Sequence, residues 1–226
     1  MYLRLGTQAP SEPTWLRAIR PDLTTRCEMK SSENSRKKRR DCVMDVHAKN
    51  WKKTLEAVYA RAFEYEQKYG SCPQCVLGAI QDVFGVVDDD TFRAGYGLAG
   101  GVGLTTEGTC GALAGGVMAL CCKYGRTREN FAKGRHSKPL ELAKELHDRF
   151  VQEYGSCICR EIHMKIFGRS FNLWDPKEFE EFERQGAHRD KCPGVVGNVA
   201  MWVAEMLLRE DRGIRPKADL HAPRFN

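Results

Sequence analysis

Cysteine is the residue type through which this chain could do chemistry. Ten of its 226 residues are cysteines, and eight of them lie between Cys72 and Cys192. A thiolate is a nucleophile, a redox group and a ligand for soft metals. Scattered thiols of this kind allow four interpretations: an iron–sulfur cluster, a metal-free dithiol, a structural zinc site, or thiols that only pack in a core.

Four of the cysteines share a local setting. Each falls in the first turn of an expected helix, shortly after a residue that could cap the helix or turn the chain. These pairs are Ser71 and Cys72, Thr109 and Cys110, Ser156 and Cys159, and Asp190 and Cys192. A helix N-terminus offers free N–H groups and positive dipole potential, and both favour the thiolate over the thiol. We therefore expect these four cysteines to be the reactive or ligating ones.

The neighbouring cysteines form weaker patterns. Cys72 and Cys75 make a C-x-x-C at a helix start. That motif could be a redox dithiol, half of a metal site, or one functional cysteine beside a core one, and the strand that precedes it in thioredoxin-like proteins is not expected here. Cys157 and Cys159 cannot share one helical face, so we expect only one of them to be functional.

Two cysteines at the end of a small-residue helix are expected to have no chemical role. Cys121 and Cys122 close the uncharged stretch TCGALAGGVMALCC, which begins at Thr109. Free cysteine behaves as a small hydrophobe and is often buried, so we expect both to fill the core. The glycines and alanines before them would let neighbouring helices come close to Cys110.

Two other features are ambiguous. The segment from Gly95 to Gly100 matches G-x-G-x-x-G, but the dinucleotide fingerprint needs a strand before it, and this segment follows a helical pattern. We interpret its glycines as allowing a tight backbone beside the site, with an anion bound by exposed amides as the weaker alternative. His163 and His188 could each be a ligand, although a hydrogen-bonded or surface role is favoured for both.

The elements that must position the thiols are all expected to be helices. From Met44 onward, apolar residues recur with helical period, and we find no strand alternation. Eight helices are predicted, at residues 51–70, 72–85, from 88 into the glycine-rich segment, 109–125, 137–155, 156–168, 175–186 and 192–210. The expected fold class is all-α, an antiparallel multi-helix bundle with short connections.

Residues three and four apart predict the buried stripe of three of these helices. The stripes are Leu55, Val58, Ala62 and Tyr65; Leu140, Ala143, Leu146 and Phe150; and Val195, Val199, Trp202 and Met206. Such stripes are typical of helices that bury one face against a core.

The order of the helices brings the four cysteines together. The helices that begin with them are the second, fourth, sixth and eighth, and short connections make every second helix point the same way. All four thiols should then meet at one end of the bundle. This expectation depends on the short helix near Phe179 reversing the chain.

The net charge of +6 belongs to the start of the chain. Residues 1–43 carry ten Lys/Arg against five Asp/Glu, and the rest carries 26 against 25. We predict that this leader is a disordered tail, or an extension from a start codon assigned too early, with initiation at Met44. Its basic run, Arg36 to Arg40, could alternatively be a nucleic-acid or targeting patch. Residues 44–212 form the expected α-helical, cysteine-rich redox domain, residues 213–226 a C-terminal tail, and nucleic acid is not an expected partner.

The sequence predicts neither a secretory signal peptide nor a membrane-spanning helix. The longest uncharged stretch, between Glu107 and Lys123, is shorter than the roughly 18 to 20 apolar residues that span a bilayer. The leader lacks the apolar stretch of a signal peptide. We therefore expect a cytoplasmic protein with no membrane partner. In such a reducing compartment, clustered thiols indicate metal or redox chemistry rather than disulfides.

Four blocks of the sequence resemble the C_GCAxxG_C_C family of redox-active proteins. They are SCPQCVLGAIQDVFG, GLAGGVGLTTEGTCGALAGGVMAL, YGSCICREIHMKIFG and DKCPGVVGNVAMWVAEML, and the resemblance covers roughly residues 52–210. The family is itself similar to part of split-Soret cytochrome c. Its cysteines correspond to Cys72, Cys110, Cys159 and Cys192, and it implies redox activity or an iron–sulfur centre.

The chain departs from the family pattern at several places. Thr109 stands before the central cysteine and Gly111 after it, and Cys75 and Cys157 are additions. Val76 follows the C-x-x-C where a c-type haem site needs His, so haem is not expected.

These observations lead to one main expectation and two alternatives. The main one is an iron–sulfur cluster held by Cys72, Cys110, Cys159 and Cys192, which exchanges electrons with a redox partner protein. The first alternative is a metal-free thiol–disulfide or peroxide oxidoreductase in which Cys110 or Cys72 attacks as a thiolate. The second is a structural zinc protein with four cysteine ligands.

Overall fold

The chain folds as an all-α protein, as the sequence predicts. The computed structural model describes residues 33–213, with side chains described from Asn50 onward. This part of the chain contains eight α-helices and no strand, and its one isolated β-bridge pairs Thr109 with Ile158. The helices are α2 Glu33–Tyr69, α3 Cys72–Phe84, α4 Asp89–Ala94, α5 Gly111–Tyr124, α6 Ser137–Tyr154, α7 Cys159–Phe167, α8 Pro176–Arg184 and α9 Cys192–Asp211. Three shorter helical segments are η1 Gly95–Leu98, η2 Phe131–Lys133 and η3 Ala187–Lys191.

The predicted leader falls only partly within the described residues. Residues 1–32 lie outside them, as do residues 214–226 of the predicted tail. Residues 33–43 belong to α2, so that helix begins before Met44, where the helical sequence pattern starts. The chain divides into two units after Asn50, and helices α3 to α9 all belong to the second unit, which begins at Trp51. The description below concerns that second unit.

The turn between α2 and α3 places the first cysteine. Gly70 (φ 63°) and Ser71 (φ 67°) both adopt the left-handed conformation, which ends α2 and reverses the chain within two residues. Glycine adopts it at little cost, whereas serine is strained there. Helix α3 then begins at Cys72, with Pro73 in its first turn, where proline is favoured because its missing N–H has no partner to lose. Ser71 occupies the cap position, but its side chain makes no capping hydrogen bond.

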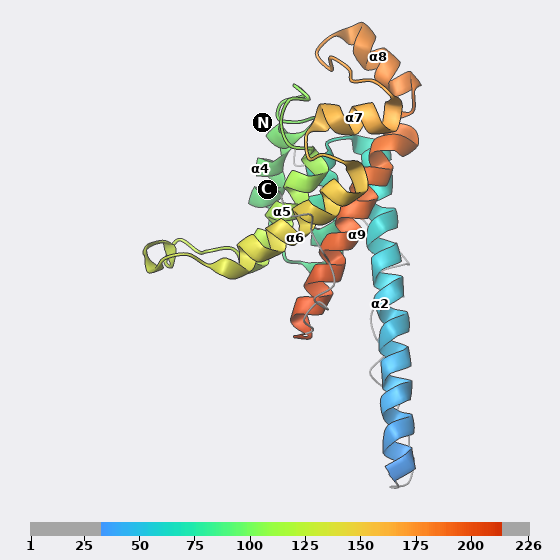
Figure 1. The fold of residues 1–226 in the computed structure, drawn as a ribbon, viewed down its shortest axis with the longest axis vertical. Coiled ribbons are helices and arrows are strands. Elements are labelled where there is room, and N and C mark those ends of the chain that lie inside the picture. The colour runs from blue at the N-terminus through green and yellow to red at the C-terminus, as the bar shows by residue number, and fades with distance from the viewer. Residues whose placement is uncertain (1–32, 214–226) are drawn as a thin grey trace, which may run out of the picture. The chain divides into compact units, whose positions relative to one another are not determined.

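Helices α3, α5 and α9 form the centre of the second unit (Figure 1). Helix α3 packs against both α5 and α9, and α5 also packs against α6. The approach of α5 to α3 is close because Gly115 has no side chain: a Cβ there would stand 2.6 Å from the carbonyl oxygen of Pro73. The small residues of the 109–122 stretch therefore bring the helix that follows Cys110 against the helix that begins with Cys72.

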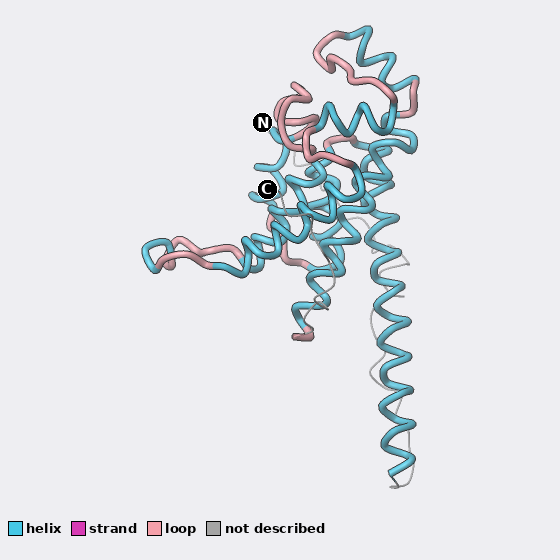
Figure 2. Tube along the Cα trace, in the orientation of Figure 1, coloured by secondary structure: helices cyan, strands magenta, loops and turns pink. Residues whose placement is uncertain are grey.

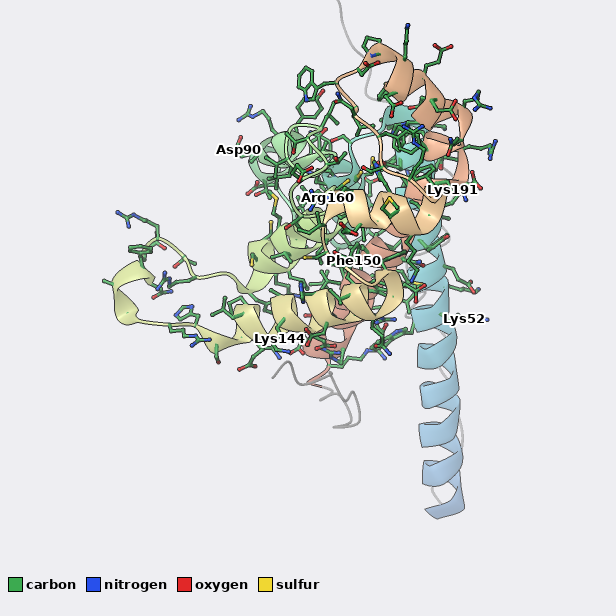
Figure 3. All side chains as sticks on the ribbon, turned by 45° about the horizontal axis from the view of Figure 1, so that its top comes forward. Lys52, Asp90, Lys144, Phe150, Arg160 and Lys191 are labelled. Atoms are coloured by element: carbon green, nitrogen blue, oxygen red, sulfur yellow. The ribbon has the colours of Figure 1, made fainter. Side chains whose placement is uncertain are left out.

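The predicted buried stripes hold for α9 and shift for α6. Every residue of the α9 stripe is buried, whereas Leu140 of the α6 stripe is 50 % exposed. The buried residues of α6 are Pro139, Leu142, Leu146, Phe150 and Tyr154. Phe150 lies among the side chains in the middle of the packed helices (Figure 3). Leu140 is exposed because it lies in the first turn of α6, next to the 125–136 connection, which extends away from the packed helices (Figure 2).

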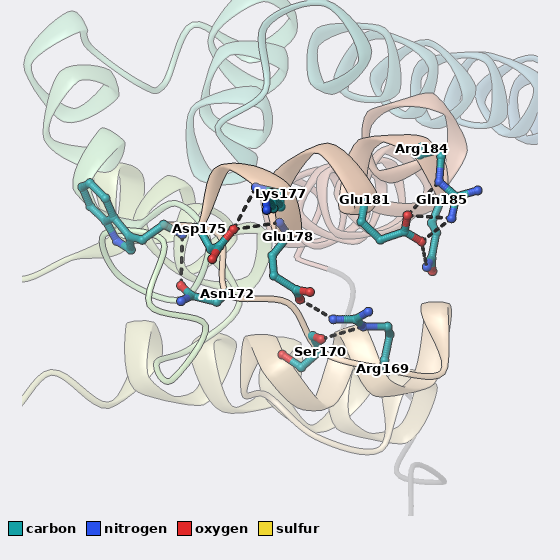
Figure 4. Close-up of polar contacts among 10 residues, drawn as sticks. Arg169, Ser170, Asn172, Asp175, Lys177, Glu178, Glu181, Arg184 and Gln185 are labelled. Carbon is teal, nitrogen blue, oxygen red and sulfur yellow. Dashed lines mark hydrogen bonds and ion pairs between the residues drawn. The ribbon is translucent and has the colours of Figure 1, made fainter.

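A small second apolar cluster lies beside the main core. It contains Phe171, Leu173 and Phe182 together with Ala187, from the α7–α8 connection, α8 and η3. Polar contacts fix the connection (Figure 4). In them, the backbone N–H of Trp174 donates to Asn172 Oδ1, and Asp175 caps the start of α8. These contacts hold Leu173 and Phe182 in place over the starts of neighbouring helices.

No helix between residues 33 and 213 combines the length and the hydropathy that crossing a bilayer would require.

Candidate functional site

The four predicted cysteines line one cavity. Its volume is about 60 Å³, and its wall includes Cys72 from α3, Cys110 from just before α5, Cys159 from α7 and Cys192 from α9. The structure therefore brings together four helix starts that are up to 120 residues apart in the sequence. This is the meeting that the alternation of helices predicts.

Apolar side chains form most of the rest of the wall. Ala112, Ile162 and Val196 come from the main core, and Leu173 and Phe182 come from the second cluster. The cavity thus lies between the two apolar clusters, in surroundings of low polarity. A charge in such surroundings interacts strongly with any partner and is costly without one.

A glycine allows the backbone to approach one of the thiols. Gly101 lies in the α4–α5 connection with φ 71°, and a Cβ there would stand 2.8 Å from the Cβ of Cys159. This agrees with the interpretation of the glycine-rich segment as a tight backbone beside the site. The backbone N–H groups of Gly103, Leu104 and Thr106 all donate to carbonyls of the same connection, so these amides are not available to an anion. The segment follows helix α4 rather than a strand, which excludes the dinucleotide fingerprint.

Cys110 has the helix-end setting that the sequence predicts. It is itself the N-cap residue of α5, and the backbone N–H groups of Ala112 and Leu113 lower the pKa of its thiol. Burial has a larger effect and raises that pKa to about 11. Thr109, the expected cap, instead pairs with Ile158 in the isolated bridge.

The other three cysteines have less access to free amides. Cys72 and Cys159 are the first residues of their helices, but the N–H of Cys159 donates to the Gly108 carbonyl at 2.9 Å. Cys192 continues a helical run, because the π-helical segment η3 precedes it and its N–H donates to Ala187. The capping role proposed for Asp190 is therefore wrong, since this residue lies inside η3.

Burial determines the protonation of the four thiols when no metal is bound to the protein. It raises the pKa of Cys72, Cys159 and Cys192 above the ordinary thiol value, and the neighbouring thiols and Glu66 raise these values further. The expectation that helix N-termini would make these groups thiolates is wrong for the chain alone, because desolvation outweighs the helix dipole. A bound metal would reverse the balance, since a coordinating thiol is deprotonated outright.

Glu66 lines the same cavity, and sequence reasoning missed it. The residue is 0 % exposed, and neither of its carboxyl oxygens has a hydrogen-bond partner. Burial raises its pKa. A signal was available, because Val58 and Ala62 continue at intervals of four to Glu66 along the buried face of α2. The predicted stripe passed through the half-buried Tyr65 instead.

Two further unpaired polar atoms belong to the cavity wall. Ser71 Oγ and His163 Nδ1 are buried without a hydrogen-bond partner, and both residues line the cavity. Among the residues with described side chains, the only other residue with such an atom, apart from Glu66, is Arg209. Each unpaired polar group costs about 1–3 kcal/mol. Their concentration at one cavity indicates a place for a ligand.

Both histidines considered as ligands also line the cavity. His163 Nε2 lies 3.7 Å from Cys159 Sγ, and burial lowers the pKa of this imidazole to about 4, so it is neutral near pH 7. His188 Nδ1 donates to Glu183 Oε1 at 2.5 Å, because the carboxylate can only accept. The hydrogen-bonded role favoured for His188 is confirmed.

The remaining cysteines of the region lie outside the cavity. The Cys75 thiol donates to the Gly70 carbonyl at 2.9 Å. Cys157 contributes its carbonyl, which accepts the N–H of Cys110 at 2.8 Å. Of Cys157 and Cys159, only the second lines the cavity, as the helical-face argument predicts. No disulfide joins any of the cysteines from residue 50 to 213.

The far end of α5 differs from its start. Cys122 is half-buried and packs against the main core, but Cys121 is exposed. The prediction that both fill the core is therefore wrong for Cys121, which lies in the last turn of the helix on its solvent side.

The described residues around the cavity provide no preformed site for a single metal ion. No three His, Cys, Asp or Glu side chains from residue 50 to 213 are close enough together to hold one metal ion. This arrangement does not match a preformed tetrahedral zinc site, in which four ligands meet at a single ion.

Comparisons with known proteins support the sequence resemblance. A family model with the description "Putative redox-active protein (C_GCAxxG_C_C)" matches residues 70–206, which include all four cysteines of the cavity. No curated protein and no solved structure matches the chain. Because the family model covers more than half of the chain, the protein belongs to the C_GCAxxG_C_C family of redox-active, cysteine-rich proteins.

Proposed function

We propose that the cavity holds an iron–sulfur cluster on Cys72, Cys110, Cys159 and Cys192, and that the protein exchanges electrons with a redox partner protein. The observation that carries the proposal is the meeting of four thiols from four helix starts at one cavity with unpaired buried polar atoms. Four thiolates are the usual ligand set for [2Fe–2S] and [4Fe–4S] clusters. We place this activity in the cytoplasm, without a nucleic-acid or membrane partner.

The donor set and its surroundings fit such a cluster. Each iron of a cluster can take a different thiolate, so the four sulfurs need not meet at a single metal ion. The buried thiols lack a cation in the protein, and iron would supply one. A metal-free dithiol enzyme fits less well, because its attacking thiol needs a lowered pKa and solvent access. None of the four thiols of this cavity has a lowered pKa, and Cys110 and Cys159 are also buried from solvent.

Each group of the chain has a definite part in this proposal. When bound, the cluster supplies one-electron redox chemistry. The four thiols provide its anionic ligands, and the apolar wall with Ile162 and Phe182 excludes water from them. His163, with its proton on Nε2, is placed to donate to Cys159 Sγ. Hydrogen bonds to ligand sulfurs are one of the factors that set a cluster's potential.

The test is iron and labile-sulfide analysis after anaerobic reconstitution, with visible absorption and EPR of the reduced protein. We expect stoichiometric iron and sulfide in the wild type. Each of Cys72→Ser, Cys110→Ser, Cys159→Ser and Cys192→Ser should lose most of the signal. Cys121→Ser is the matched control, because it changes an exposed thiol on the same helix that follows Cys110. It should behave as the wild type.

Other results would select another function. A metal-free protein that loses thiols reversibly in pairs after mild oxidation would favour the dithiol enzyme. Zinc that is retained through oxidation and reduction, with no measurable potential, would favour the structural site. Normal iron and sulfide in all four serine variants would exclude these cysteines as the ligands.

A further inference from the structure

Glu66 is the buried group that the four cysteines leave unexplained. It lies on α2, four residues before Gly70, and outside residues 70–206 that the family model matches. Its side chain is fully buried and lines the cavity beside the four thiols. The two preceding positions of the same buried face, Val58 and Ala62, are apolar. An apolar residue would therefore continue this face, and a carboxyl group needs a reason to be there.

The carboxyl group is costly in either protonation state. As an anion it loses its hydration, which costs several kcal/mol in a protein interior without a partner. As a neutral acid it still has a donor and an acceptor to satisfy. Neither Glu66 oxygen has a hydrogen-bond partner, so protonation alone does not remove the cost.

Burial raises the pKa of Glu66, and the nearby thiols of Cys75 and Cys72 lower it in part, but neither thiol lies in hydrogen-bonding geometry to a carboxyl oxygen. The proton of the Cys75 thiol is committed to the Gly70 carbonyl. His188 Nε2 lies 3.9 Å from Glu66 Oε1, beyond hydrogen-bond distance, and the Nδ1 of the same ring is held by Glu183. The partner must therefore come from the cavity itself. Buried charges in proteins are either paired or coordinate metals.

We propose that Glu66 is a fifth protein ligand, which binds through oxygen to one iron of the metal group that the cavity holds and raises the coordination number of that iron above the four of its neighbours. The inference rests on the proposed function, because it assumes iron bound by the cysteines. Direct coordination would neutralise the buried carboxylate, and carboxylate oxygens are common ligands to iron in proteins. Glu66 lines the same cavity as the four thiols, so its carboxyl group faces the space that the irons would occupy. His188, anchored on Glu183, would act as a positioning residue behind the carboxylate.

The test compares Glu66→Gln with Glu64→Gln after reconstitution with ⁵⁷Fe. Glu64 is the matched control, because it lies on the same helix with a side chain 51 % exposed. Mössbauer spectra of the wild type should contain one iron with a distinctly larger isomer shift, because oxygen ligation produces this shift. That component should vanish in Glu66→Gln and persist in Glu64→Gln. We also expect Glu66→Gln to lose iron to a chelator roughly ten-fold faster than the wild type.

A second readout needs no metal. Glu66→Leu in the chelator-treated chain should unfold at a higher urea concentration than the wild type, because it removes an unpaired buried carboxyl. A lower midpoint would show that the carboxyl group stabilises the fold, and would overturn the proposal. Equivalent irons in the wild type, or unchanged spectra and iron release in Glu66→Gln, would overturn it while leaving the four-cysteine cluster intact. A wild type that takes up no iron would overturn both proposals.

Discussion

The main core and the cysteine cavity lie side by side, and they differ in the hydrogen bonding of their buried polar groups. In the core, the hydroxyl of Tyr154 accepts a hydrogen bond from Asn198 Nδ2 at 2.8 Å. At the cavity, Glu66, Ser71 and His163 each have an unpaired polar atom. The polar group of the core is thus satisfied within the protein, whereas the polar groups of the cavity lack hydrogen-bond partners that a ligand would provide.

The difference shows which region is built for stability. Native proteins keep unpaired buried polar groups rare, and those that persist usually serve a function. Substitutions in the core should therefore lower stability. Some substitutions at the cavity should raise the stability of the metal-free chain. The following predictions test this contrast through the size and the sign of the change in the free energy of unfolding.

The largest expected effect is the loss of a core aromatic ring. Phe150→Ala should lower the free energy of unfolding by about 3–5 kcal/mol, because Phe150 is 0 % exposed and tightly packed against Tyr154. Phe182→Ala should cost less, because Phe182 already borders a cavity, so that its removal enlarges an existing space instead of opening a new one in the core. Urea denaturation of the metal-free chain, followed by circular dichroism, measures both values.

An exposed ring provides the control for this pair. Phe131 is 58 % exposed, so Phe131→Ala should change the free energy of unfolding by no more than about 0.5 kcal/mol. Equal losses for Phe150→Ala and Phe182→Ala would show that the cavity wall is packed as tightly as the core. The contrast between the two regions would then fail.

The paired polar group of the core should give an intermediate effect. Tyr154→Phe leaves Asn198 Nδ2 without its acceptor, so we expect a loss of about 1–2 kcal/mol near pH 8. Burial raises the pKa of Tyr154 to about 12, whereas the unfolded chain ionises near 10. The tyrosine therefore stabilises the fold fully below pH 10, and this contribution is lost as the pH rises from 10 to 12.

Urea denaturation at pH 8 and pH 11 measures this change. The stability gap between the wild type and Tyr154→Phe should be smaller at pH 11, because only the wild type loses the contribution of Tyr154. A gap that is absent at pH 8 would show that the hydroxyl of Tyr154 is not a paired group of the core. A gap that widens at pH 11 would contradict the raised pKa.

The meeting of the cysteines could be predicted from the sequence, and the electrostatics of the site could not. Helix periodicity places Cys72, Cys110, Cys159 and Cys192 at or next to helix starts, because periodicity depends on local pattern. The connections before α5 and α6 are longer than the short ones that the argument from helix order assumes. Protonation depends on burial by distant segments such as the α7–α8 connection with Leu173. No local pattern reports that burial, so the thiolate expectation was wrong.

The burial of three residues differs from the prediction, and in each case the reason lies in the position of the residue on its helix. Cys121 and Leu140 are apolar or small residues near helix ends, where a face that is buried further along the helix becomes exposed. Glu66 does not fit the pattern that predicts a buried stripe, because that pattern counts apolar residues and Glu66 is the polar residue on the buried face of α2. The start of α2 at Glu33 lies in a segment without an apolar period.

The smallest expected effect should have the opposite sign to those of the core. Ser71 adopts φ 67°, where a side chain is strained, and its buried Oγ has no partner. Ser71→Gly removes both costs, and the greater entropy of glycine in the unfolded chain offsets part of the gain. We expect the metal-free chain to become more stable by about 0.5–1 kcal/mol, measured by urea denaturation with chelator present. The gain should shrink in the iron-loaded protein, where the hydroxyl is available to the bound group. A loss of stability in the metal-free chain would mean that the Ser71 hydroxyl is already satisfied, and that the cavity is no less complete than the core.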